Sequence, residues 1–245
     1  MDLGESVYFS RLSVIFLPSP MEAETHMELK FKNISHKLID SLSDGVFSIA
    51  LTLLGLNVVE SVPEISHSKN INAAFIEHWP TFLSYTLGFI ILFSSWYQYH
   101  VISQYTHNTN AWIVWNHGLS LAWVALLPFG VAMLAHNLNT SNRSWGVFYF
   151  GICLFGTSWT NWIFFACVRF KAPIEYTDDL PISTEEMIRA STIFLSMAGV
   201  LGLILVPLSL VNPWIALVGY AIYVGSSARP IESFNRLLPI LNKRQ

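Results

Sequence analysis

The sequence over residues 41–59 reads SLSDGVFSIALTLLGLNVV, and it decides the fold. This stretch is long and apolar enough to cross a bilayer as a helix, yet it carries Asp44 near one end and hydroxyl side chains further in. At about 100° per residue, one face of that helix is formed by Gly45, Ile49, Thr52, Leu53 and Leu56. Asp44 and Ser48 point elsewhere. We interpret the first face as the wall of an ion path and the second as the surface that holds this helix to its neighbours.

The composition is that of an integral membrane protein. The 245-residue chain is 53% hydrophobic and 12% charged, and its mean hydropathy of +0.46 is outside the usual range of soluble domains. Its formal net charge of -3 is too small to indicate a nucleic acid partner. Cys153 and Cys167 fall in one apolar segment, at a spacing that favours neither a disulfide nor a metal site.

Six stretches are predicted to be membrane-spanning helices because each is long and apolar. They are Ile39–Val59, Pro80–Ile102, Ala111–Ala135, Trp145–Val168, Ile188–Val211 and Pro213–Ala228. Pro128 and Pro207 lie inside two of these spans and are expected to bend them unless neighbouring helices satisfy the freed carbonyl groups.

The basic residues predict the orientation of the chain. Of the 13 lysines and arginines, 11 fall on the side of the two termini, and only Lys69 and Arg143 fall on the other side. Both termini are therefore expected in the cytoplasm. The expected domains are a cytoplasmic leader at residues 1–38, a six-helix membrane domain at 39–228 and a cytoplasmic tail at 229–245.

Two connections are longer than the rest, one on the outer side at Ser61–Glu77 and one on the inner side at Arg169–Glu186. The inner connection is acidic, and its Ser183-Thr184-Glu185-Glu186 sequence is typical of a helix cap. We favour a solvated loop before a helix over an alternative in which these acids form a vestibule that attracts cations.

No sequence motif of an enzyme is present. The chain contains no nucleophile elbow, no zinc-protease motif, no glycine-rich phosphate loop and no paired carboxylates within a span. His100 and His117 lie at membrane depth, where hydrogen bonding across a helix interface is favoured over a metal or proton-relay role. We predict that the protein is not an enzyme and has neither a metal site nor a cofactor.

The segment from Leu42 to Leu54 resembles the Phe-Ser-Asp signature on the first helix of the transmembrane protein 175 family of potassium-permeable channels. The second span is similar to that family's aromatic and histidine pattern at Tyr85, Phe89, Trp96 and His100, and the third span at Asn116, Leu121 and Pro128-Phe129. The resemblance covers about residues 41–135. Two positions depart from the signature, because Leu42 replaces the aromatic residue and Leu38 replaces an arginine, with Lys37 one place away.

The resemblance implies a six-helix subunit of a homotetramer in which four copies of the first helix surround a central pore. It implies a hydrophobic constriction of aliphatic rings at Ile49, Leu53 and Leu56, with Thr52 as a polar layer. Potassium would be the permeant ion, selected modestly over sodium, and the protein would lie in the plasma membrane. Without the resemblance, such an aliphatic stripe would be interpreted as ordinary bundle packing.

Asp44 lies off the proposed pore face, so we expect it to join an interhelical network with Ser43, Trp96, His100 and Asn116. Either Lys37 or the pair His100 and Asn116 would replace the missing arginine as its partner. Two alternatives remain open from the residues. One is a proton-coupled secondary transporter that uses Asp44 and His100, and the other is a non-conducting membrane scaffold.

Overall fold

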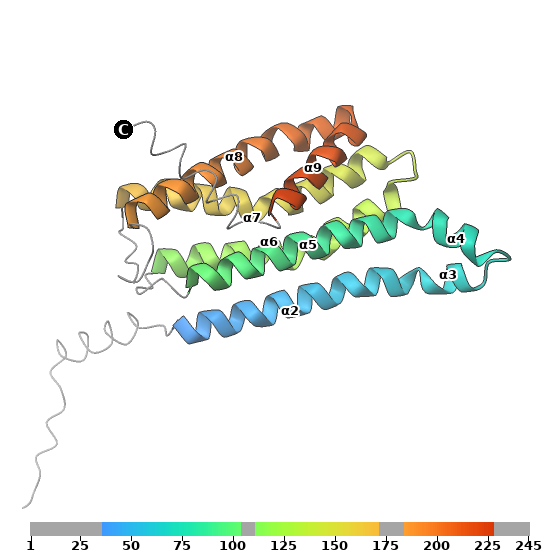
Figure 1. Ribbon diagram of the computed structural model, residues 1–245, viewed down its shortest axis with the longest axis horizontal. Helices are drawn as coiled ribbons and strands as arrows, with labels where there is room; N and C mark the ends of the chain where they lie inside the picture. Colours follow the sequence, from blue (N-terminus) through green and yellow to red (C-terminus); the bar gives the residue numbers. More distant parts are fainter. Residues whose placement is uncertain (1–35, 104–110, 172–183, 228–245) are drawn as a thin grey trace, which may run out of the picture. The chain divides into compact units, whose positions relative to one another are not determined.

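The structure is a computed structural model that describes residues 36–103, 111–171 and 184–227. All of these belong to the second of two units into which the chain divides, Ser35–Gln245. The tail and nearly all of the leader therefore lie outside the described residues, as does most of the inner connection. Every regular element in the described ranges is a helix (Figure 1), so the all-α prediction is confirmed for them.

The long helices differ from the predicted spans by four residues or fewer at either end. They are α2 His36–Glu60, α5 Trp79–Ser103, α6 Ala111–Asn137, α7 Arg143–Lys171, α8 Thr184–Val211 and α9 Pro213–Ser227. Among the described residues, Leu38–Ser66 and Val114–Asn137 are long and apolar enough by themselves to cross a membrane, with mean hydropathies of 1.7 and 2.0. The crossing of the bilayer by all six helices stays a prediction.

The outer connection contains two short helices that were not predicted, α3 Val62–Ser66 and α4 Ile71–Glu77. Proline in the first turn of α3 fits a helix start, because its missing N–H would have no intrahelical partner there. Asn70 begins α4, since its side-chain oxygen accepts a hydrogen bond from the backbone N–H of Ala73 at 3.2 Å. The sequence therefore did contain a cap signal in a segment that we expected to be a plain loop.

Prolines and asparagines shape the later helices. Both α6 and α8 continue through their internal prolines, Pro128 and Pro207. Asn212 separates α8 from α9, and its side-chain oxygen accepts a hydrogen bond from the N–H of Ile215 at 3.2 Å. Pro213 occupies the first position of α9. An asparagine cap followed by proline is thus the physical reason for the tight turn at this point.

Helix α2 packs against α5 and α6, while α6 packs against α7 and α7 against α8. Helices α2, α5 and α6 approach one another closely at Gly88. A Cβ atom at this position would lie 2.6 Å from Cγ2 of Val131 and 3.3 Å from Cδ2 of Leu54. Since carbon atoms in contact normally lie about 3.5–4.0 Å apart, the three helices approach this closely only because residue 88 has no side chain.

Candidate functional site

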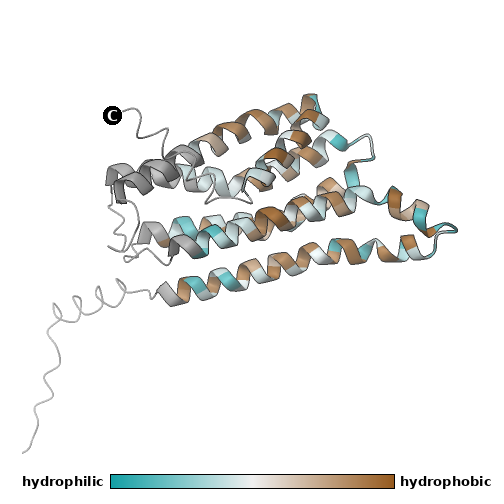
Figure 2. Ribbon diagram, in the orientation of Figure 1, coloured by the Kyte–Doolittle hydropathy of each residue, from teal (hydrophilic) through white to brown (hydrophobic). Residues whose placement is uncertain are grey.

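Helix α2 is apolar along most of its length (Figure 2), but only one of its faces is covered by the rest of the chain. Phe47, Ala50 and Leu54 are 4%, 1% and 0% exposed, because they pack against the neighbouring helices. The predicted pore residues lie on the opposite side. Ile49, Leu53 and Leu56 are 62%, 41% and 49% exposed. The aliphatic face therefore points away from the body of its own subunit.

The two small or polar residues on the same face are also uncovered. A Cβ atom at Gly45 would meet no atom within 4 Å. Thr52 is exposed, and its hydroxyl donates a hydrogen bond to the carbonyl oxygen of Ser48 at 2.8 Å. Because a hydroxyl has one proton and two lone pairs, the threonine oxygen retains acceptor capacity on the exposed face.

Asp44 is held by a tryptophan from α5. The indole Nε1–H of Trp96 donates a hydrogen bond to Oδ1 of Asp44 at 2.9 Å. The same indole stacks on the ring of His100, with 5.5 Å between the ring centroids and 21° between the planes. Asn116 is half-buried on α6. The side chain of Lys37, one of the expected partners of Asp44, lies outside the described residues.

Sequence reasoning missed Asp40 and Tyr99 among the polar contacts on this side of α2, whereas the prediction that His117 bonds across a helix interface is confirmed. The hydroxyl of Tyr99 donates a hydrogen bond to Oδ1 of Asp40 at 2.9 Å. Nε2 of His117 lies 2.6 Å from Oγ of Ser43, and the ring of His117 stacks on that of Tyr99 at 4.2 Å. Helical spacing was the available signal, because Asp40 precedes Asp44 by about one turn and Tyr99 follows Trp96 by about one turn.

The aromatic residues that carry the resemblance on α5 form, together with Phe93, one row of rings in contact, in which two pairs are stacked and two are tilted. The row runs Tyr85, Phe89, Phe93, Trp96 and His100, with successive centroid distances of 6.0, 6.1, 5.8 and 5.5 Å. Trp96 is the member of this row that contacts Asp44. The row therefore ends beside the polar contacts of α2.

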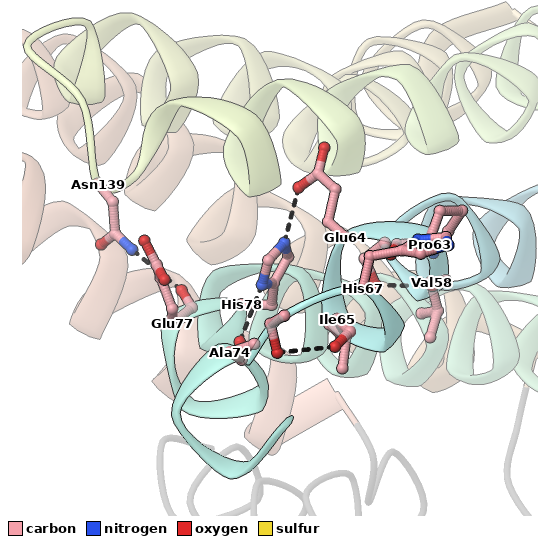
Figure 3. Close-up of polar contacts among 11 residues, drawn as sticks. Val58, Pro63, Glu64, Ile65, His67, Ala74, Glu77, His78 and Asn139 are labelled. Carbon is pink, nitrogen blue, oxygen red and sulfur yellow. Dashed lines mark hydrogen bonds and ion pairs between the residues drawn. The ribbon is translucent and has the colours of Figure 1, made fainter. Parts of the chain in front are cut away.

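At the other end of α2, His78 joins the two short helices (Figure 3). Its Nδ1 lies 2.9 Å from the carbonyl oxygen of Ala74, and its Nε2 lies 2.9 Å from Oε2 of Glu64. Both partners are acceptors, so only the doubly protonated imidazolium donates to both. The hydrogen bond that His78 donates to Glu64, and then the one that it donates to Ala74, raise the pKa of His78 above its ordinary value.

The described part of the chain holds no group of three histidine, cysteine, aspartate or glutamate side chains arranged for a metal ion. The geometry instead presents an uncovered aliphatic face on a long apolar helix whose polar residues bond to neighbouring helices. Long apolar helices joined by interhelical hydrogen bonds are typical of α-helical membrane proteins.

Comparison with known proteins shows a family to which part of this chain is similar. Residues 39–128 match the sequence model of the family described as endosomal/lysosomal potassium channel TMEM175. That region contains nearly all of α2, the whole of α5 and every residue to which we assign a site role. Over residues 39–128, this chain is therefore similar to the TMEM175 family.

Two curated relatives share the region. One, named a potassium channel of Chamaesiphon minutus, is 33% identical over 101 residues, which cover 41% of this chain and 49% of the relative. The other, named a potassium channel of Streptomyces collinus, is 30% identical over 106 residues, which cover 43% and 50%. The chain spans about half the length of the curated relatives that it matches.

A solved structure shares the fold. It is the crystal structure of a lysosomal potassium-selective channel TMEM175 homolog from Chamaesiphon minutus, with a TM-score of 0.63 and 21% sequence identity. The likeness covers 79% of this chain and 97% of that one. It extends beyond the region of sequence similarity, so the fold likeness reaches the later helices, where the motif pattern is weak.

Proposed function

We propose that this protein is a potassium-permeable cation channel in which α2 from each of four identical subunits lines a shared pore. The observation that carries the proposal is the uncovered aliphatic face of α2, on which Ile49 is 62% exposed while Ala50 beside it is 1% exposed. The similarity of residues 39–128 to the TMEM175 family and the names of the two curated relatives support potassium as the permeant ion.

The proposed constriction consists of rings of Ile49, Leu53 and Leu56, each supplied once per subunit. A narrow aliphatic ring is a barrier because an ion there loses water and gains no oxygen ligands. A small outward rotation of α2 would let a partly hydrated cation pass. Potassium would cross more readily than sodium, since it holds its water less tightly, and the selectivity would be modest.

Thr52 would supply a polar layer within this aliphatic lining. Its hydroxyl proton is used by the carbonyl of Ser48, so the oxygen would present lone pairs to a passing cation. The protein would lie in the plasma membrane, as the resemblance implies. Both termini would be in the cytoplasm, as the distribution of basic residues predicts.

The experiment is to record currents from the purified full chain in bilayers with potassium on one side and sodium on the other. Ile49→Asn is expected to hydrate the ring, raise the cation current and move the reversal potential toward zero. Ile222→Asn is the matched control, because Ile222 is 68% exposed on α9 and is predicted to face lipid. Equal conductance and reversal potential in Ile49→Asn and the unsubstituted channel would exclude Ile49 from the constriction.

The same recordings separate the two alternatives from a channel. A proton-coupled transporter that uses Asp44 and His100 gives flux that saturates with substrate and depends on a proton gradient. A scaffold gives no current. Unitary current steps whose size rises with the potassium gradient are expected instead.

A further inference from the structure

Two further interhelical contacts lie near the bond between Asp44 and Trp96, one from Asp40 about one turn earlier in α2 and one from Ser43 directly before Asp44. Asp40 bonds to Tyr99 of α5, and Ser43 bonds to His117 of α6. We propose that these four residues form a clamp that sets the rotation of α2 about its own axis and so the direction in which Ile49 faces the pore. This inference rests on the proposed function, because it assigns positioning residues to the same helix.

The proton positions in the clamp follow from the partners. The hydroxyl of Ser43 donates to the carbonyl oxygen of Ile39 at 2.7 Å, which uses its single proton. The contact of 2.6 Å with His117 therefore has the serine oxygen as acceptor and the imidazole Nε2–H as donor. Ser43 is 0% exposed, so its loss would leave this donor without its acceptor inside the bundle.

Tyr99 joins the two halves of the clamp. Its hydroxyl donates to Asp40 on α2, and its ring lies 4.2 Å from that of His117 on α6, with 19° between the planes. Asp40 and Ser43 are three residues apart, so they occupy one side of α2. The clamp thus joins three helices through one side of α2, and a turn of that helix would strain both hydrogen bonds together.

The uncharged residue at position 38, near the start of α2, explains why this chain would need the clamp. The position at which the family signature has an arginine holds Leu38, which is 67% exposed and has no charge to offer. Hydrogen bonds from Tyr99 and His117 would orient this end of α2 without a charge at residue 38. Phe47, Ala50 and Leu54 are buried further along α2, so we expect their packing to keep the bundle folded when the clamp is lost.

The test measures which side of α2 faces the pore. Single cysteines replace Ile49 or Ser48 in a reconstituted full chain that also carries Cys153→Ala and Cys167→Ala. A cationic thiol reagent is then applied, and its rate of current block is measured at each position. With the clamp intact, the cysteine at position 49 is expected to react faster than that at 48, because only residue 49 lies on the aliphatic face.

Tyr99→Phe removes one hydrogen bond of the clamp and keeps the ring. Loss of one hydrogen bond changes the equilibrium between the clamped and the rotated position of α2 by about fivefold. The rate of block at cysteine 49 divided by the rate at cysteine 48 is therefore expected to fall about fivefold. Asp40→Ala should lower the ratio equally, whereas Asp40→Asn should preserve it, because the amide oxygen still accepts from Tyr99. This pair tests the hydrogen bond without altering the ring stack.

Tyr223→Phe is the matched control. The hydroxyl of Tyr223 lies 2.9 Å from that of Ser158, so this variant removes a tyrosine hydrogen bond of equal length between α9 and α7. It should leave the ratio unchanged. An unchanged ratio in both Tyr99→Phe and Asp40→Ala, or an equal fall in Tyr223→Phe, would overturn the clamp while the pore stands. If the thiol reagent blocks the current at neither cysteine when the clamp residues are unsubstituted, the proposed pore is overturned, and the clamp with it.

Discussion

Replacement of Gly88 by alanine tests how closely α2, α5 and α6 approach one another. The new Cβ atom would lie 2.6 Å from Cγ2 of Val131, about 1 Å inside a normal carbon–carbon contact. It would also lie 3.3 Å from Cδ2 of Leu54. Overpacking of this kind costs about 1–3 kcal/mol. Alanine also stabilises a helix by about 1 kcal/mol relative to glycine. Gly88→Ala must therefore be compared with the same substitution at a glycine that has free space around it.

Gly118→Ala supplies that comparison, because a Cβ atom there would meet no atom within 4 Å. The thermal unfolding midpoint in detergent is expected to be lower for Gly88→Ala than for Gly118→Ala by about 2–12 °C, at about 2–4 °C per kcal/mol for a chain of this size. Val131→Ala removes the nearest atom, so Gly88→Ala should cost less in that background. A midpoint for Gly88→Ala equal to or above that of Gly118→Ala would refute the close approach.

Two further predictions concern the ends of α2. Asp44→Ala removes the acceptor of the Trp96 indole and is expected to lower the yield of assembled protein in size-exclusion chromatography more than it changes the reversal potential; normal assembly with lost selectivity would contradict this structural role. The His78–Glu64 contact raises the pKa of the imidazole above 6.5, so its stabilisation is fully present below pH 6.5 and is lost as the pH rises through the raised pKa. In an NMR titration, Glu64→Gln should lower the pKa of His78, and an unchanged titration would show that Glu64 is not the cause.

The sequence predicted the long helices well because hydropathy and length are local properties. The start of α9 could be predicted as well, since Asn212 and Pro213 make a turn whatever surrounds them. The short helix α4 was missed although Asn70 is a cap residue, because seven residues give a periodic pattern too short to recognise.

The polar contacts of α2 were predicted less completely. Asp44 and Trp96 were expected in one network, but the partner of Ser43 is His117, next to the predicted Asn116. Asp40 and Tyr99 were not anticipated. Helical spacing assigns a residue to a side of its own helix, whereas the residue it meets depends on the register between two helices, which no single segment contains.

The sequence by itself determined that this chain forms long apolar helices, and that α2 carries aliphatic side chains together with an acidic residue. Only the tertiary structure decided which aliphatic side chains are covered. Leu53 and Leu54 are chemically identical neighbours, yet Leu53 is 41% exposed and Leu54 is 0% exposed. The difference arises because the close approach at Gly88 brings α5 against Leu54, and the rotation of about 100° between successive residues turns Leu53 away from that contact.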